Sequence, residues 1–179
     1  MIKIRLLAEK DLAAVLTLPQ VIDAVEQGFA SEARGQINTF PVVMEAIPAH
    51  GAGFGIKSSY VPATEALGLK IGGFWPQPAG SPVPAHFALI YLADGATGKP
   101  LAFMDGNLIT TWRTGAAGAV AAKYLARPDS TRVGVIGAGV QGQIQVLALR
   151  EFFDISEVRV WSRSPESVNR YVETMAGRS

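Results

Sequence analysis

A chain of 179 residues is long enough for one or two domains and for a sizeable hydrophobic core. Hydrophobic residues make up 49% of the chain and charged residues only 17%, which excludes a disordered protein and indicates a globular one. The formal net charge of +1 gives no electrostatic reason to expect nucleic acid or an anionic membrane surface as a partner.

The sequence contains no cysteine, which excludes disulfide bonds, thiolate catalysis and cysteine-bound metal ions. Its two histidines, His50 and His86, are too few for a histidine-rich metal site built by this chain alone. The first residues lack the apolar stretch and cleavage site of a signal peptide, and no run of about 18 apolar residues predicts a membrane span. We therefore expect a soluble cytoplasmic protein without a metal site.

Residues 1–127 predict an α+β domain with a mainly antiparallel sheet. Residues 2–7 alternate as an opening strand, and a helix is expected from Leu18 to about Arg34, with Pro19 in its first turn. The apolar period then changes to two, with proline and glycine between the segments. The strands expected there cover residues 42–47, 53–61, 69–75, 86–93 and 101–105, and the last two should form a hairpin through the turn at 94–100.

A helix expected over residues 108–125 is rich in alanine and glycine. Small side chains over several turns let a helix lie close against a sheet, a partner subunit or a cofactor. The exposed connector Arg127-Pro128-Asp129-Ser130 follows, and we place the domain boundary between residues 127 and 128.

Residues 131–142, TRVGVIGAGVQG, predict a strand that runs directly into a glycine-rich turn and then a helix. Val133, Val135 and Ile136 are expected to be buried in that strand. The turn has the spacing G-x-G-x-x-G, in which the glycines allow a tight turn, a close approach to a pyrophosphate and close packing of helix on strand. The alternative is a tight strand–helix turn that binds nothing.

A second strand is expected over residues 157–161 and a further helix over 167–175. Where NAD-binding domains usually carry an acidic residue, this sequence has Ser162, Arg163 and Ser164. Such a cluster suits a 2′-phosphate and favours NADP(H) over NAD(H), unless Arg163 only solvates the helix start. Two parallel strands are fewer than a doubly wound domain needs, so we expect a fragment, or a chain completed by another chain.

Four further side chains are candidates for chemistry. Arg113 stands in an otherwise uncharged helix, so it should meet a substrate carboxylate or the pyrophosphate, a structural ion pair being the alternative. Lys70, between Leu69 and Ile71, suggests an inward-facing amine that binds a carboxylate or exchanges protons. Lys57 is either a similar functional lysine or a residue on an exposed strand face. His86 is either a proton donor or a structural residue.

Three segments make the sequence resemble the ornithine cyclodeaminase/mu-crystallin family: GLKIGGFWP, the long run from HFALIYLADGATGKPLAF to TTWRTG, and VGVIGAGVQGQ. The longest is far more specific than the glycine turn. The resemblance implies an N-terminal substrate-binding and dimerisation domain over residues 1–127 and the first part of a Rossmann domain over 128–179. It also implies a homodimer that passes a hydride between a nicotinamide and the carbon bearing an amino or imino group.

By motif position, Lys70 resembles the family lysine that contacts the substrate and assists proton transfer. Arg113, followed by Thr114, resembles the arginine beside the substrate carboxylate and the cofactor phosphates. Two departures stand out: an arginine common in the early strand falls near Met44, with Lys57 as its candidate replacement, and the family's catalytic aspartate lies beyond Ser179. The other cofactor-binding residues implied are Gly137, Gly139, Val140, Gln141, Gly142, Ser162, Arg163 and Ser164.

Together these features predict an NADP(H)-dependent imine reductase or amino-acid dehydrogenase, with NAD(H) as the alternative cofactor. The resemblance leaves open an ornithine cyclodeaminase, which converts ornithine to proline and ammonia. A third hypothesis is a crystallin-like protein that binds a nucleotide without turnover.

Overall fold

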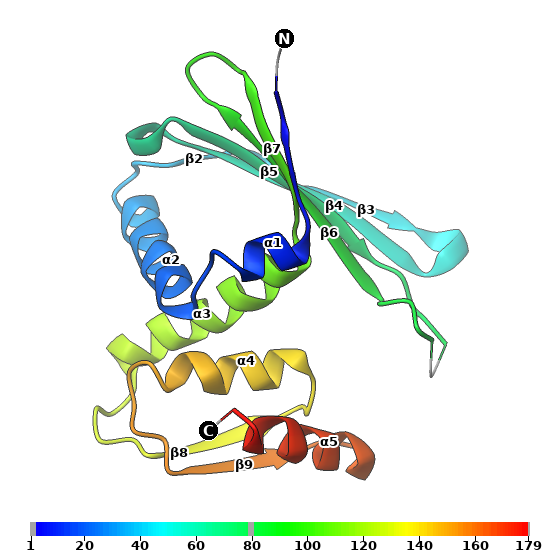
Figure 1. Cartoon of the computed structure of the whole chain (residues 1–179), viewed down its shortest axis with the longest axis vertical. Helices are drawn as coiled ribbons and strands as arrows, with labels where there is room; N and C mark the ends of the chain where they lie inside the picture. Colours follow the sequence, from blue (N-terminus) through cyan, green and yellow to red (C-terminus); the bar gives the residue numbers. More distant parts are fainter. Residues whose placement is uncertain (1–2, 79–80, 179) are drawn as a thin grey trace. The chain divides into compact units, whose positions relative to one another are not determined.

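The structure is a computed structural model, and it describes residues 3–78 and 81–178. The chain divides into two compact units (Figure 1). The first unit contains Met1–Val15 and Phe29–Thr110, and the second contains Leu16–Gly28 and Thr111–Ser179. Two long helices, α2 (Leu18–Ala33) and α3 (Asn107–Leu125), therefore contribute residues to both units.

The first unit is built on a sheet with seven strands among the described residues. The order across the sheet is β1 (Arg5–Leu7), β7 (Pro100–Asp105), β6 (His86–Asp94), β5 (Ala66–Phe74), β4 (Ala52–Val61) and β2 (Asn38–Thr39), and β3 (Val43–Ile47) also pairs with β4. Figure 1 shows the long strands β4, β5 and β6 lying side by side. All neighbouring pairs are antiparallel except β1 and β7, which are parallel.

The strands predicted from the period of two are confirmed, and so is the one predicted hairpin, between residues 86–93 and 101–105. Two hairpins turn through short 3₁₀ segments, η1 (Pro48–His50) and η2 (Pro62–Thr64). The third joins β6 to β7, where the Asp94 carboxylate accepts a hydrogen bond of 2.8 Å from the backbone N–H of Thr97. Helix α1 (Glu9–Ala13) and the two-residue strand β2 were not predicted.

The second unit contains a parallel pair of strands, β8 (Arg132–Ile136) and β9 (Glu157–Trp161). Helix α4 (Val140–Leu149) connects them and helix α5 (Pro165–Ala176) follows, as predicted for the start of a Rossmann domain. One face of the pair packs on buried residues of the two helices: Val133, Val135, Val158 and Val160 contact a cluster of Val146, Tyr171 and Met175.

The predicted burial of Ile136 is wrong, because its exposed fraction is 87%. Side chains alternate between the two faces of a strand, so Ile136 lies one position out of phase with the half-buried Val133 and Val135. Its partner in the register is Trp161, which is also exposed. The two apolar side chains thus end the strands on the face that α4 and α5 do not cover.

Helix α3 lies close against the helices α2 and α4. That its small residues also admit a partner subunit or a cofactor stays a prediction. Ala116 and Ala119 are fully buried in a cluster with Ile22 of α2 and Ala148 of α4. A Cβ on Gly115 would lie 2.8 Å from Cγ1 of Ile144 and 2.9 Å from its carbonyl oxygen. The helices therefore meet at a separation that only glycine permits at this position.

The packing of α3 explains why the division between the two units differs from the predicted domain boundary between residues 127 and 128. The predicted boundary follows the connector between α3 and β8. From Thr111 onward, however, α3 packs on α2 and α4 and belongs to the second unit. The assignment of substrate binding to residues 1–127 and of dinucleotide binding to 128–179 stays a prediction.

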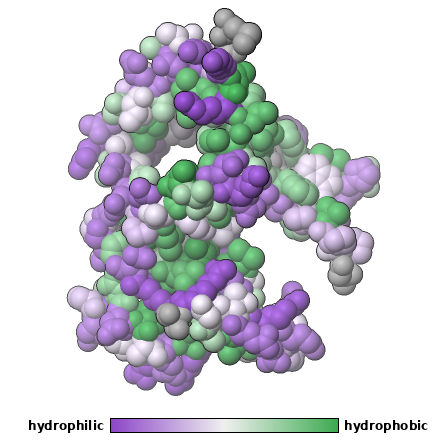
Figure 2. Space-filling model, viewed as in Figure 1, coloured by the Kyte–Doolittle hydropathy of each residue, from purple (hydrophilic) through white to green (hydrophobic). Residues whose placement is uncertain are grey.

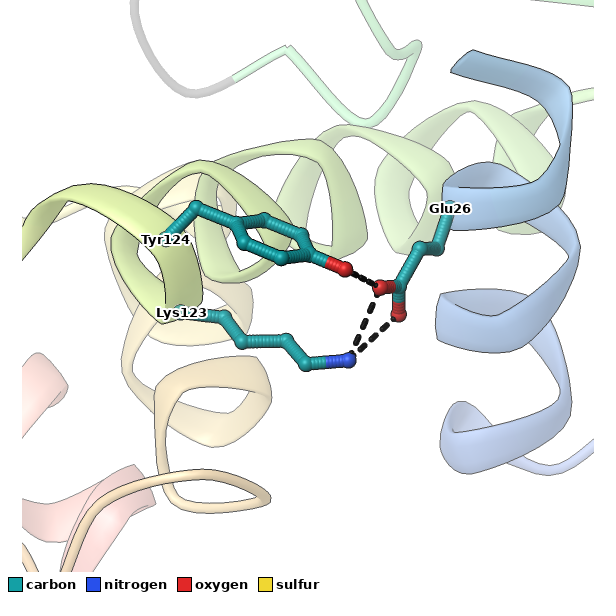
Figure 3. A network of polar contacts seen from close by, with 3 residues as sticks. All are labelled: Glu26, Lys123 and Tyr124. Atoms are coloured by element: carbon teal, nitrogen blue, oxygen red, sulfur yellow. Dashed lines mark hydrogen bonds and ion pairs between the residues drawn. The ribbon is translucent and has the colours of Figure 1, made fainter. Parts of the chain in front are cut away.

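A polar network in the second unit joins α2 to the end of α3 (Figure 3). The ammonium group of Lys123 lies 2.8 Å from both carboxylate oxygens of Glu26, and the hydroxyl of Tyr124 donates to the same carboxylate. The hydrogen bonds from Lys123 and Tyr124 lower the pKa of Glu26 below its usual value. The network supplements the apolar contact of the two helices at Ile22.

Apolar side chains also reach the surface of both units, and Figure 2 shows hydrophobic surface interspersed with hydrophilic surface. Leu6 in the first unit is 78% exposed and Leu125 in the second is 85% exposed. Single exposed apolar residues are common in soluble proteins. An apolar partner could pack on such side chains without burying polar groups.

The glycines of α2 and α3 provide a test of the close helix packing. A Cβ on Gly28 would meet no heavy atom within 4 Å, whereas on Gly115 it would collide with Ile144. We expect Gly28→Ala to raise the free energy of unfolding by about 0.5 to 1 kcal/mol through helix propensity. Gly115→Ala should lower it by about 1 to 2 kcal/mol, because overpacking outweighs propensity. Urea unfolding measures both, and shifts of the same sign would contradict the packing.

Candidate functional site

The glycine-rich turn of the second unit joins β8 to α4. The backbone N–H of Gly137 donates to the carbonyl of Trp161 at 2.8 Å, so the turn starts as an extension of the sheet. Gly137 has a φ of 109°, a backbone conformation that residues with a side chain rarely adopt. Gly139 is the N-cap of α4, with no side-chain hydrogen bond on the first N–H groups of the helix.

The surroundings of the three glycines fit the phosphate-binding role predicted for them. A Cβ on Gly142 would lie 2.4 Å from the Gly137 carbonyl oxygen and 3.0 Å from Cγ1 of Val135, so helix and turn touch there. Gly137 and Gly139 instead face open space, with no heavy atom within 4 Å of an added Cβ. Val140 and Gln141 are exposed at the positive end of the helix. The turn is thus an open cradle with backbone donors that fits a pyrophosphate.

Helix α5 contacts the first turn of α4 through Tyr171. The Tyr171 hydroxyl donates to the carbonyl of Gly142 at 3.2 Å, and only 2% of the residue is exposed. Burial raises the pKa of the Tyr171 phenol above its usual value. The residue was absent from the predicted site, and its position in the apolar period of a helix gave no signal of the contact.

The cluster predicted to bind a 2′-phosphate lies between β9 and α5. Ser164 is the N-cap of α5: its hydroxyl accepts from the N–H of Ser167 at 3.1 Å and donates to the Glu166 carboxylate at 2.7 Å. The hydroxyl of Ser162 accepts from the N–H of Ser164 at 3.5 Å. Arg163 is exposed between them.

Sequence reasoning missed Glu166 beside this cluster. Its pKa is lowered, chiefly by the hydrogen bond from Ser164. The spacing of serine at the N-cap and glutamate at the second helical position was the available signal. Ser164 caps the helix, and the binding of a 2′-phosphate by Arg163 stays a prediction.

The first unit brings Lys57 and Lys70 together. They are direct partners in the register of β4 and β5, so both project from the same face of the sheet. Lys57 is exposed and Lys70 is half-buried. The row continues through Ile90 of β6 to Met104 of β7, both apolar. The register thus places the two candidate lysines on one sheet face, a pairing that the sequence did not predict.

The adjacent row on the same face has small residues on three strands. Gly55, Gly72 and Ala88 are paired across β4, β5 and β6, and Met44 of β3 continues the row with its thioether lying over Gly55. Gly106 follows β7, and its N–H donates to the Ala88 carbonyl at 2.8 Å, so α3 begins beside this row. A Cβ on Gly106 would lie only 2.8 Å from the Ala88 Cβ. The two lysines thus border a row of small residues that Met44 covers at Gly55 and that leads to the N-terminus of α3.

Asn107 begins α3 at the end of this strip. Its backbone N–H donates to the Asp105 carboxylate at 2.8 Å, while its own Oδ1 is buried without a hydrogen-bond partner among the described residues. A buried carbonyl oxygen without a partner is uncommon in proteins. Asn107 belongs to the long sequence motif but was not predicted as a site residue.

His86 lies on the same sheet face but away from the lysines. It pairs with Phe74 at the start of β6, four residues before Ile90, which is the partner of Lys70. At about 3.4 Å per residue it lies about 14 Å along the strand. His86 is exposed, and its role in substrate binding stays a prediction.

Met44 occupies the position where a family arginine was expected. It pairs with Gly55, one row from Lys57 and on the same face. An apolar thioether here leaves Lys57 as the neighbouring cation. The replacement of the arginine by Lys57 stays a prediction, which this register supports.

The argument from burial for Arg113 is wrong, because Arg113 is exposed on α3. An exposed guanidinium is solvated, so no anion is needed to offset a desolvation penalty. It forms no ion pair with any residue in the described ranges. Arg113 and Thr114 belong to the second unit and Lys70 to the first, and the backbone carbonyl of Thr114 accepts from the Gln145 amide at 3.0 Å.

Two classes of site find no support in the described part of the chain. No group of three or more histidine, aspartate or glutamate side chains could hold a metal ion there. No helix in it is both long and apolar enough to span a bilayer.

A mainly antiparallel sheet unit followed by a parallel strand pair with a glycine-rich turn is the arrangement of two-part α/β proteins with a Rossmann-type second part. The sequence model of the ornithine cyclodeaminase/mu-crystallin family matches residues 4–178. The chain therefore belongs to this family, and the predicted resemblance and fold class are confirmed.

Relatives of known structure share the arrangement. The chain is 38% identical over 169 residues to an iminosuccinate reductase of Paracoccus denitrificans, covering 94% of this chain and 53% of that one. A Δ1-pyrroline-2-carboxylate reductase of Thermococcus litoralis, solved with NADH and L-proline, has a TM-score of 0.92 at 35% identity, covering 97% and 54%. An archaeal alanine dehydrogenase dimer with bound NAD has a TM-score of 0.91 at 31% identity, covering 98% and 54%. The chain spans about half the length of these relatives.

The hydroxyl of Tyr171 provides a test of the contact behind the cradle. Tyr171→Phe should lower the free energy of unfolding by about 1 kcal/mol at pH 7, because one hydrogen bond is lost. The folded state holds the phenolic proton more tightly than the unfolded state. The stability of the unsubstituted protein should therefore decline as the pH rises past about 10. Urea unfolding between pH 7 and 11 measures this decline, and an equally steep decline in the variant would contradict the assignment.

Proposed function

We propose that this chain forms part of an NAD(P)H-dependent oxidoreductase that acts on the C–N bond of a small amino or imino acid, as an imine reductase or amino-acid dehydrogenase. The observation that carries the proposal is the open phosphate cradle at Gly137 and Gly139, in a chain of this family. The names of its relatives, an iminosuccinate reductase and an alanine dehydrogenase among them, support the same reaction type.

In this reaction the bound nicotinamide supplies a hydride, which adds to the imine carbon while a proton adds to its nitrogen. The chain's own residues bind and orient. Backbone N–H groups at the start of α4 hold the pyrophosphate, with the positive end of the helix dipole behind them. Lys70 provides an ammonium group for the substrate carboxylate or for proton transfer at the nitrogen. Arg113 is the second proposed catalytic cation, for the carboxylate or the cofactor phosphates.

For the cofactor we propose NADP(H) in preference to NAD(H), with Arg163 as the group that selects it. Support comes from the exposed guanidinium directly after β9, where a 2′-phosphate would reach the start of α5. Two observations favour NAD(H) instead. Ser164 caps the helix and lies beside the acidic Glu166, and three solved relatives hold NADH, NAD or NAD⁺. The proposed preference for NADP(H) therefore depends on Arg163.

We also propose a cytoplasmic homodimer. One solved relative is described as a dimer, and the exposed apolar side chains of the sheet unit, such as Phe87 and Leu89, supply surface for a second copy. Ornithine cyclodeamination is the second candidate reaction. A 38% identity over 79 residues to an ornithine cyclodeaminase of Agrobacterium fabrum supports it. A nucleotide binder without turnover remains the third.

The test of the function uses the natural gene product that carries these residues. Titration with NADPH and NADH, followed by nicotinamide fluorescence, should show binding at micromolar concentrations, and a keto acid with ammonium should then oxidise the bound cofactor. Binding without turnover of any amino or imino acid would favour the non-catalytic hypothesis. Release of ammonia from ornithine would favour the cyclodeaminase. Absence of dinucleotide binding would contradict the proposal as a whole.

Arg163→Gln tests the cofactor preference. Loss of a charge-assisted hydrogen bond should raise the dissociation constant for NADPH roughly tenfold to a hundredfold and leave that for NADH nearly unchanged. Arg159→Gln is the matched control, since Arg159 lies on β9 and its guanidinium already pairs with Glu157 at 2.6 Å. An equal change for both cofactors would contradict the role of Arg163.

A further inference from the structure

Gln145 of α4 reaches across to the backbone of α3. Its side-chain amide donates a hydrogen bond of 3.0 Å to the carbonyl of Thr114, and this contact is partly buried. Gly118, one helical turn after Thr114, leaves room for the side chain. A Cβ on Gly118 would collide with Oε1 of Gln145 and lie 3.0 Å from its Cδ. The hydrogen bond therefore depends on the glycine at this position of α3.

The rest of the contact between α3 and α4 includes apolar residues and a second glycine. Ala116 and Ala148 share one buried cluster, and Gly115 meets Ile144. Apolar contacts are non-directional, so they permit one helix to slide a short way along the other. A hydrogen bond instead requires its donor and acceptor to lie within about 3 Å and nearly in line. Gln145 thus fixes the position of α3 along α4.

Helices α3 and α4 run in the same direction, from right to left in Figure 1. The contacts agree, because residue numbers rise together along both segments. Gly115 meets Ile144. Further along, the ammonium group of Lys123 lies 5.1 Å from the centroid of the Phe152 ring, just after the end of α4. The residues of α3 before Gly115 therefore lie toward the glycine-rich turn from which α4 starts.

Arg113 belongs to this part of α3, one residue before the carbonyl that Gln145 holds. Its side chain is exposed, and it forms no ion pair with any residue that the structure describes. The position of its backbone therefore decides which part of a ligand the guanidinium can reach. A dinucleotide on the glycine-rich turn would present its phosphates at the start of α4, toward which this part of α3 lies.

We propose that Gln145 is a positioning residue, which holds α3 at one place along α4 and thereby places Arg113 for the bound dinucleotide. This inference rests on the proposed function, because it requires a dinucleotide at the glycine-rich turn. Helix α4 then has two roles. The backbone N–H groups of its first turn bind the pyrophosphate, and its second turn, through Gln145, holds the helix that supplies the cation.

The experiment measures dinucleotide binding to the natural gene product by nicotinamide fluorescence, at a temperature well below its unfolding transition. Gln145→Met keeps the length of the side chain but cannot donate to Thr114. The dissociation constants for NADPH and NADH should rise by the same factor, roughly threefold to tenfold, because one hydrogen bond no longer fixes α3. Gln27→Met, at an exposed glutamine of α2, is the matched control that leaves both constants unchanged.

A double-mutant cycle with Arg113→Met separates positioning from a purely structural contact. When Arg113 is already replaced, Gln145→Met should raise the two dissociation constants little further, because the group that it positions is gone. A purely structural hydrogen bond would lower the free energy of unfolding and leave the dissociation constants unchanged. That result, or an equal effect of Gln145→Met with and without Arg113, would overturn the proposal.

Gly118→Ala tests the same hydrogen bond from the side of α3 and serves where Gln145→Met fails to fold. The nearest atoms to its added Cβ belong to the far end of the Gln145 side chain, which can move, and alanine favours a helix. The variant should fold, displace the amide from Thr114 and raise both dissociation constants. Unchanged constants would overturn this inference alone. Absence of dinucleotide binding by the unsubstituted protein would overturn the proposed function with it.

Discussion

The antiparallel register of β4 with β5 is the constraint on which the candidate substrate face depends. Alternation of side chains means that a slip of one residue would send Lys57 and Lys70 to opposite faces. The register also aligns Gly55 with Gly72, so the row of small residues follows from the same pairing. The turn at η2 supports it, because Glu65 adopts a left-handed φ of 49° there. The chemistry of this face is thus set by backbone pairing over nine residue pairs.

The cradle of the second unit depends on a different kind of constraint, which is steric contact. Gly142 touches the Gly137 carbonyl, and the hydroxyl of Tyr171 ties the same turn of α4 to α5. Each contact fixes the helix close to its strand, while the turn at Gly137 and Gly139 has no heavy atom within 4 Å of an added Cβ. A site held by packed elements on one side and empty on the other is preorganised for an anion.

Much of this structure could be predicted from the sequence. The strands from β3 to β7 follow from their period of two, and the β8–α4 turn follows from its glycine spacing. Helix α1 was missed because its N-cap is alanine, and the Asp11 carboxylate that accepts from Ala8 at 2.9 Å gives only a weak signal. Strand β2 was missed because two polar residues, Asn38 and Thr39, carry no apolar pattern.

The errors at individual residues share a physical origin. Composition around Arg113 is apolar, yet burial depends on which side of α3 faces the other helices, and Arg113 projects from the exposed side. Ile136 is apolar but lies on the uncovered face of β8. In both cases the sequence shows the neighbours along the chain, but burial depends on the neighbours in space, which tertiary packing determines.

Selection among substrates within one fold must then come from a few side chains on a shared framework. Under the proposed function Met44 and Lys57 are such side chains, since they lie in adjacent rows on this sheet face, Met44 on β3 and Lys57 on β4. Exchanging which of the two positions carries the cation would move positive charge to the neighbouring strand and by two residues along it, without altering the strand pairing. Under that proposal, substitution at these two positions changes the charge that the face offers a substrate while the glycine-rich turn of the second unit remains as it is.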